Sequence, residues 1–168
     1  MRVEGYKVFN KGLINCYGKK FEAQHEYKVD TSKRSIEYGI EGYGFHFAKR
    51  LEDCLRFFDG MNEDIEIAKV VSTGEIKESY DDYNGYYDLY VTDQIYIERI
   101  LTRKEIVDYI KHTSFDRIER FISGYRLTEK EIDQILENDK LNILDKTVEY
   151  YQYGNKDAYT KCKSSNLN

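Results

Sequence analysis

The sequence lacks the residues that usually mark a metal site or a disulfide framework. Its 168 residues include no proline, no tryptophan, three histidines and three cysteines, Cys16, Cys54 and Cys162. None of the histidines and cysteines has the short spacing of a zinc motif, so we expect no metal. An odd number of well-separated cysteines is typical of free thiols in a reducing compartment.

Long apolar runs and blocks of basic residues are also missing. No stretch approaches membrane-spanning length, and the first ten residues, MRVEGYKVFN, do not have the pattern of a signal peptide. We therefore expect a cytoplasmic protein that acts inside the cell that makes it and has no membrane partner. The formal charge of −5 argues against direct nucleic-acid binding by the chain as a whole.

Tyrosine is abundant, with 17 residues, beside 8 phenylalanines. Several tyrosines lie in the acidic segment YDDYNGYY at residues 80–87, whose Asn84-Gly85 pair predicts a hairpin tip. This segment is either a solvated loop or a surface for a partner protein, because tyrosine combines a large apolar ring with a hydroxyl. The candidate partner-binding residues are Asp81, Asp82, Tyr83, Tyr86 and Tyr87.

Hydrophobic periodicity predicts an α+β protein. Alternating apolar residues indicate an N-terminal antiparallel β-rich domain over residues 1–101, with strands near 2–10, 21–29, 45–47, 65–71 and 94–101. Helical spacing and two capping-box patterns, at Thr102 and at Thr128, predict a helical extension over residues 102–153, and residues 154–168 form a polar tail.

The stretch Gly42 to Phe58, GYGFHFAKRLEDCLRFF, predicts a short strand that leads directly into one central helix. Such a junction is a common position for a binding site, because the helix N-terminus offers free N–H groups. His46 in this strand is either a catalytic acid or base or a structural histidine. Cys54 lies on the apolar stripe of the helix, which favours a buried, unreactive thiol.

Glu98 lies in the last predicted strand, four residues after Gln94. Its carboxylate could stabilise a developing cation or act as a base if this strand lines a cleft. The alternative is an exposed glutamate on the polar face of a half-buried strand.

Residues 4 to about 106 resemble a domain family of unknown function found in bacteriophage and prophage proteins. The resemblance rests on Tyr6-Lys7-Val8-Phe9-Asn10-Lys11, on Gly44-Phe45-His46 and on Asp53-Cys54-Leu55. It also includes Ala68-Lys69-Val70 and the strand at Ile95 and Ile97. It implies a phage or mobile-element origin and no particular activity.

Gly44-Phe45-His46-Phe47-Ala48 followed by an apolar helix is also similar to a strand and helix of ADP-ribosyltransferases. That similarity implies NAD as cofactor and Glu98 as the catalytic carboxylate. His46 is a second catalytic candidate because of its place in the strand, and not because of the similarity. The residues that it implies for NAD binding are Tyr6, Asn10, Gly44, Phe45 and Phe47. A likeness of fold does not fix a function.

Three hypotheses follow for the function. The first is a small acidic phage or prophage protein, without a cofactor, that binds a host or defence protein and inhibits it in the manner of an anti-CRISPR protein. The second is an NAD-dependent enzyme that ADP-ribosylates a host target. The third is a structural component of the virion.

Overall fold

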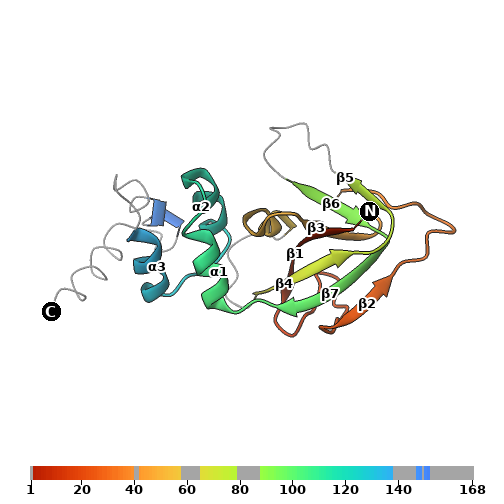
Figure 1. Ribbon diagram of the computed structural model, residues 1–168, viewed down its shortest axis with the longest axis horizontal. Helices are drawn as coiled ribbons and strands as arrows, with labels where there is room; N and C mark the ends of the chain where they lie inside the picture. The colour runs from red at the N-terminus through yellow and green to blue at the C-terminus, as the bar shows by residue number, and fades with distance from the viewer. Residues whose placement is uncertain are drawn as a thin grey trace. The chain divides into compact units, whose positions relative to one another are not determined.

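The computed structural model describes residues 2–39, 42–57, 65–78, 88–137, 147–148 and 150–151. The chain divides into two compact units. The first comprises Met1–Phe58 and Asp64–Thr102, and the second comprises Asp59–Glu63 and Arg103–Asn168. The first unit is a seven-stranded antiparallel sheet and the second is helical, which confirms the α+β prediction (Figure 1).

The sheet has the strand order β2-β7-β4-β1-β3-β6-β5. Its long central strands are β1 (Val3–Asn10), β4 (Ile65–Ser72) and β7 (Gln94–Ile100), which match three of the predicted strands. The shorter strands are β2 (His25–Lys28), β3 (Phe45–Ala48), β5 (Ile76–Glu78) and β6 (Leu89–Thr92). The 3₁₀ helix η1 (Leu51–Phe57) follows β3, where the sequence predicts the central helix.

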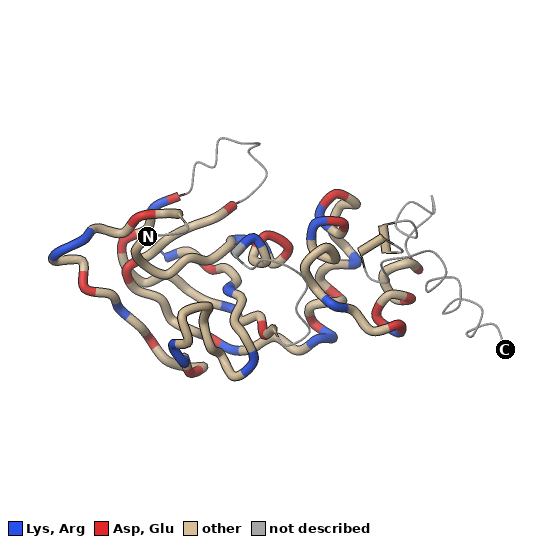
Figure 2. The backbone as a smooth tube through the Cα atoms, turned by 180° about the vertical axis from the view of Figure 1, so that it is seen from behind, with Lys and Arg blue, Asp and Glu red and all other residues tan. Residues whose placement is uncertain are grey.

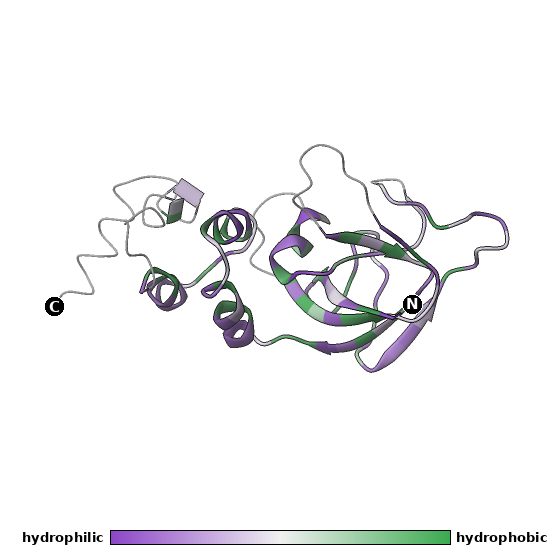
Figure 3. Ribbon diagram, turned by 45° about the horizontal axis from the view of Figure 1, so that its top comes forward, coloured by the Kyte–Doolittle hydropathy of each residue, from purple (hydrophilic) through white to green (hydrophobic). Residues whose placement is uncertain are grey.

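The main core lies on one face of a curled sheet. Strand alternation directs Phe9, Phe45, Phe47, Val70, Ile95 and Ile97 to this face, and all six are buried. Residues from both edge strands, Tyr27 of β2 and Ile76 of β5, pack against the same cluster. The two edges therefore curl around one core, and the hydropathy colouring shows apolar segments within the sheet (Figure 3).

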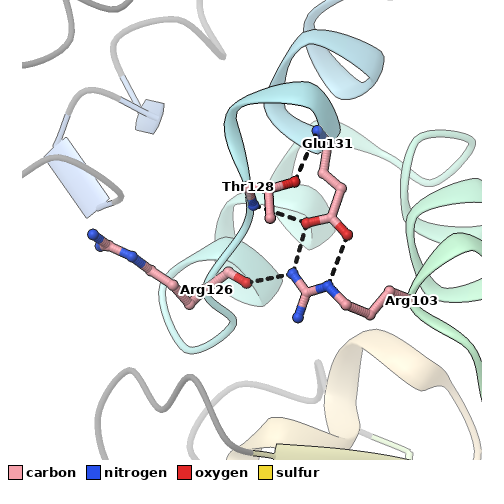
Figure 4. Close-up of polar contacts among 4 residues, drawn as sticks. All are labelled: Arg103, Arg126, Thr128 and Glu131. Atoms are coloured by element: carbon pink, nitrogen blue, oxygen red, sulfur yellow. Dashed lines mark hydrogen bonds and ion pairs between the residues drawn. The ribbon is translucent and has the colours of Figure 1, made fainter.

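The helical unit contains α1 (Arg103–Ile110), α2 (Phe115–Ile122) and α3 (Glu129–Leu136), as the helical spacing predicts. The capping box predicted at Thr128 is confirmed, because the Thr128 hydroxyl accepts a hydrogen bond from the Glu131 N–H and the Glu131 carboxylate accepts one from the Thr128 N–H (Figure 4). The rest of the predicted helical extension, after residue 137, and the polar tail fall mostly outside the described residues. No helix in the described part of the chain is long and apolar enough to cross a bilayer.

Candidate functional site

Strand pairing brings three of the predicted residues to one face of the sheet. Tyr6 lies opposite Ala48 of β3 on one side and opposite Lys69 of β4 on the other. Because side chains alternate along a strand, His46 shares the face of Ala48 and Tyr6. Glu98 joins this face through an ion pair with Lys69.

A β-bulge carries Glu98. Lys69 is paired with Arg99 and Val70 with Ile97, so the residue between them on β7 has no partner in the register. Bulges redirect side chains and are frequent next to active sites. The bulge is a feature that the sequence pattern of β7 does not indicate, and it distinguishes Glu98 from an ordinary polar residue of a strand.

Lys69 holds two carboxylates at this bulge. Its Nζ lies 3.4 Å from Glu98 Oε2 and 3.2 Å from Glu4 Oε2. The hydrogen bond with Glu4 is the largest cause of the raised pKa of Lys69; burial opposes it, and the charges of Glu98 and Glu4 add to it. Burial raises the pKa of the nearby Tyr6 hydroxyl, and the charge of Lys69 partly offsets this. The result is a half-exposed carboxylate oriented by an ammonium group, which itself lies opposite Tyr6.

His46 does not belong to the same constellation as Glu98. Two strands, β4 and β1, separate β7 from β3. Neighbouring strands are about 4.8 Å apart, which places the two residues on strands roughly 14 Å apart. The two predicted catalytic residues therefore cannot act together on one substrate atom in this arrangement.

The His46 imidazole is neutral at pH 7. Burial lowers its pKa to about 4, with a further contribution from the Lys7 ammonium, and hydrogen bonds with the backbone of Glu37 and Gly44 oppose this. The Tyr38 ring lies 5.5 Å from the imidazole, between centroids. A neutral imidazole at this position could accept a proton but could not donate one as an imidazolium.

The residues predicted to bind NAD are dispersed. Phe45 and Phe47 are 6% and 0% exposed and contribute to the core, where Phe47 stacks on Tyr90. Gly44 leads into β3 with φ +123, and Asn10 ends β1, where it pairs with Ile65. Of the five, Tyr6 lies beside the Lys69 and Glu98 pair, and the buried rings offer no open face to a nicotinamide as they stand.

Lys7 is a charged residue at a core-facing position that the sequence reading did not single out. It lies two residues before Phe9 on β1 and therefore on the same face of the sheet. Its ammonium lies 5.6 Å from the centre of the Phe9 ring. Its Nζ donates a 2.7 Å hydrogen bond to the His46 carbonyl oxygen. Burial lowers the pKa of Lys7 to about 8. A lysine in phase with the apolar positions of a strand was the signal that could have identified it.

The lysine bonds to His46 where the ladder between β1 and β3 stops. These strands share one residue pair, Tyr6 with Ala48. Beyond it, the Lys7 ammonium satisfies a carbonyl that a neighbouring strand would otherwise bond. Cys54 on η1 is fully buried, as predicted, and burial raises the pKa of its thiol.

The candidate partner-binding residues Asp81, Asp82, Tyr83, Tyr86 and Tyr87 lie outside the described residues. The strands on either side of them are described: β5 ends at Glu78, β6 begins at Leu89, and the two pair in antiparallel register. Among the described residues, no group of three or more histidine, cysteine or acidic side chains is arranged to hold a metal ion.

Comparison with known proteins identifies a family. Residues 3–107 match the domain of unknown function DUF7666, and because the match covers more than half of the sequence, the chain belongs to this family. The match has nearly the same limits as the resemblance noted in the sequence, and it carries no activity. No curated protein and no solved structure matches the chain.

Proposed function

We propose that this DUF7666 protein is a phage- or prophage-encoded binding protein that engages a host or defence protein and inhibits it. The observation that supports this most directly is the hairpin of β5 and β6 at the edge of the sheet. The acidic, tyrosine-rich sequence is the connection between these two strands. A short edge hairpin is a suitable place to present a recognition segment, because the sheet fixes the two strands from which the segment extends.

Further acidic groups lie at the base of this hairpin. Glu78 is exposed at the end of β5, and Asp88 precedes β6 and forms a 3.0 Å ion pair with Arg50. Burial, with the charges of Glu78 and Asp88, raises the pKa of the Tyr90 hydroxyl. Lys77 and Arg50 balance these two charges, so the negative charge of the β5–β6 connection rests on Asp81 and Asp82. This favours a partner with a basic surface, such as many nucleic-acid-binding proteins.

Charge reversal tests this proposal. The tagged chain is used to capture proteins from a bacterial host lysate, in parallel with a D81K/D82K variant. The matched control is D133K/E137K, which makes the same change in charge at exposed positions of the helical unit. A partner retained by wild type and control but lost with D81K/D82K supports the proposal. A partner retained equally by all three, or no partner at all, contradicts it.

The bulge at Glu98 favours a second candidate, an NAD-dependent ADP-ribosyltransferase. In this hypothesis Glu98 stabilises the cationic sugar that develops when the nicotinamide bond breaks, and Lys69 orients the carboxylate. Tyr6, directly opposite Lys69, would contact the cofactor. Phe45 and Phe47 are part of the core, so the hypothesis rests on Tyr6 and Glu98.

Labelled NAD separates the two candidates. Wild-type protein is incubated with lysate and labelled NAD, beside E98Q and, as a matched control, E4Q, which removes the other carboxylate bound to Lys69. Transferase activity predicts a labelled protein that E4Q retains and E98Q loses by about 100-fold or more. Equal labelling by E98Q would refute the role of Glu98, and no label with any form would contradict the transferase candidate.

A further inference from the structure

The chain between β1 and β2 forms a well-ordered turn. Asn10 and Lys20 each make a β-bridge with Ile14, and the Asn15 side chain accepts hydrogen bonds from the N–H groups of Tyr17 and Lys19, at 3.1 and 2.8 Å. Buried Leu13 and Phe21 anchor its two sides in the core. The turn is thus fixed at several points in spite of its exposed position.

This turn presents an aromatic ring to solvent. Tyr17 is 78% exposed, more than any other tyrosine or phenylalanine in the described part of the chain. Lys19 and Lys20 follow it and are also exposed. Because the backbone of the turn is already ordered, binding of a ligand over Tyr17 would not lose conformational entropy by ordering it.

Lys19 connects this turn to further aromatic rings. The Lys19 ammonium is 5.3 Å from the centre of the Phe21 ring and 5.6 Å from that of Tyr27 on β2. The exposed His25 ring packs against Tyr27 at 4.7 Å between centroids. The contacts through Lys19 therefore connect the turn to the rings of β2. We call Tyr17, Lys19, Lys20, His25 and Tyr27 the Tyr17 platform.

The platform lies in a basic part of an acidic chain. Residues 11–28 contain four lysines and two glutamates, whereas the whole chain has a net charge of −5. The tube of Figure 2 shows basic positions in this part of the chain. One of the two glutamates, Glu26, accepts a 2.8 Å hydrogen bond from the Thr73 hydroxyl. The expectation that the chain does not bind nucleic acid directly rests on the net charge and the lack of basic blocks in the whole sequence. It does not take the local charge of this surface into account.

From these features we propose that the Tyr17 platform binds single-stranded nucleic acid. Exposed rings stack on bases of any sequence, and lysines between them neutralise the phosphates. On the platform, Lys19 lies over the Tyr27 ring, which packs partly against the core, and the exposed His25 ring packs on Tyr27. The exposed rings available for stacking are those of Tyr17 and His25. An acidic protein would use the lysines but would need a pocket for Tyr17, which a stack of bases does not require.

Fluorescence anisotropy with a labelled 20-nucleotide oligothymidylate tests the proposal on the full chain at low salt. Binding should weaken as salt is added, since counterions are released from the strand. Y17A should raise the Kd at least about fivefold while Y17F preserves it, because stacking requires the ring and not the hydroxyl. K19E/K20E should weaken binding further, and the matched control K104E/K130E in the helical unit should bind like wild type.

Two results would overturn the proposal. One is no change in anisotropy at about 100 µM protein, the weak limit of non-specific binding. The other is binding that Y17A leaves intact and that polyglutamate displaces as readily as unlabelled oligothymidylate, which would identify a general site for acidic polymers, including acidic proteins. Because the platform shares no residue with the β5–β6 hairpin or the Glu98 bulge, neither result bears on the proposed function.

Discussion

Arg103 and Glu131 form a bidentate ion pair that fastens the first residue of α1 to the first turn of α3. Arg103 Nε lies 2.8 Å from Glu131 Oε1, and Nη2 lies 2.6 Å from Oε2. The same Nη2 donates to the Arg126 carbonyl at 2.8 Å, and Glu131 Oε2 accepts from the Thr128 N–H (Figure 4). One carboxylate thus closes the capping box of α3 and binds α1 at the same time.

This shared carboxylate makes Arg103 a sensitive position for the stability of the helical unit. The Glu131 side chain is 14% exposed and that of Arg103 is 44% exposed, so solvent weakens the pair only in part. We expect R103A to lower the free energy of unfolding by about 1–2 kcal/mol. R103K should recover little, because an ammonium cannot form the two parallel bonds. Urea denaturation followed by helical circular dichroism measures this.

The neighbouring exposed Lys104 provides the control for Arg103. K104A removes one positive charge from the same turn of α1 without touching Glu131, and it should change the free energy of unfolding by less than about 0.5 kcal/mol. If R103K is as stable as wild type, charge alone accounts for the interaction and the bidentate geometry contributes nothing.

Local patterns predict the long strands and the helices well, for a physical reason. β1, β4 and β7 are long enough for their apolar residues to show the two-residue period, and α2 shows the helical one. The Thr128 capping box needs only residues within one turn, so the sequence contains all of it.

Strand β6, like β5, is an element that the sequence reading missed. Its four residues, Leu89-Tyr90-Val91-Thr92, are all buried, so no alternation of polar and apolar residues marks it. It also follows directly on the tyrosine-rich segment, which the sequence reading extends as a loop. Burial on both faces comes from pairing with β3 and β5, which local sequence does not specify.

The candidate site could be predicted only in part, because its geometry depends on strand order. The sequence identifies Tyr6, His46 and Glu98, but β4 and β1 lie between the strands of the last two. Phe45 and Phe47 have the alternation of core residues as much as that of a binding strand. The bulge at Glu98 and the ammonium of Lys7 at the end of the β1–β3 ladder appear only in the assembled sheet.

The neutral, buried His46 imidazole should make the protein less stable in acid. Its pKa is about 4 in the folded state, against 6.5 for an ordinary histidine. As the pH falls from 6.5 to 4, His46 becomes protonated in the unfolded chain but stays neutral in the folded chain, so the free energy of unfolding decreases. We expect His46 to account for about 1–3 kcal/mol of this decrease, and H46Q to abolish that part.

Urea denaturation at several pH values between about 7 and 4.5 measures the contribution of His46. H112Q replaces an exposed histidine of the helical unit and is the matched control, which should follow the wild-type profile. Parallel profiles for wild type and H46Q would show that the imidazole is protonated in the folded protein well above pH 4, and thus that it is more open to solvent than the structure indicates.

Lys7 should make the free energy of unfolding increase with pH in the alkaline range as well. Burial lowers its pKa to about 8 against 10.5 in an ordinary lysine, and the charges of Cys54 and Cys16 oppose this. Below pH 8 both states carry the proton; above it the folded chain releases the proton first, so the free energy of unfolding rises with pH. We expect a contribution of about 2 kcal/mol by pH 9.5, below the range in which tyrosines ionise.

K7M separates this alkaline effect from the hydrogen bond that Lys7 donates. Loss of the bond to the His46 carbonyl should cost about 1–3 kcal/mol at every pH, since that oxygen is left without its donor. Loss of the titration should remove the rise above pH 8, so the two profiles diverge as the pH increases. The exposed control K104M should keep the rise. A K7M profile that stays parallel to wild type up to pH 9.5 would mean that the Lys7 ammonium is solvated, and that the end of the β1–β3 ladder is open to water.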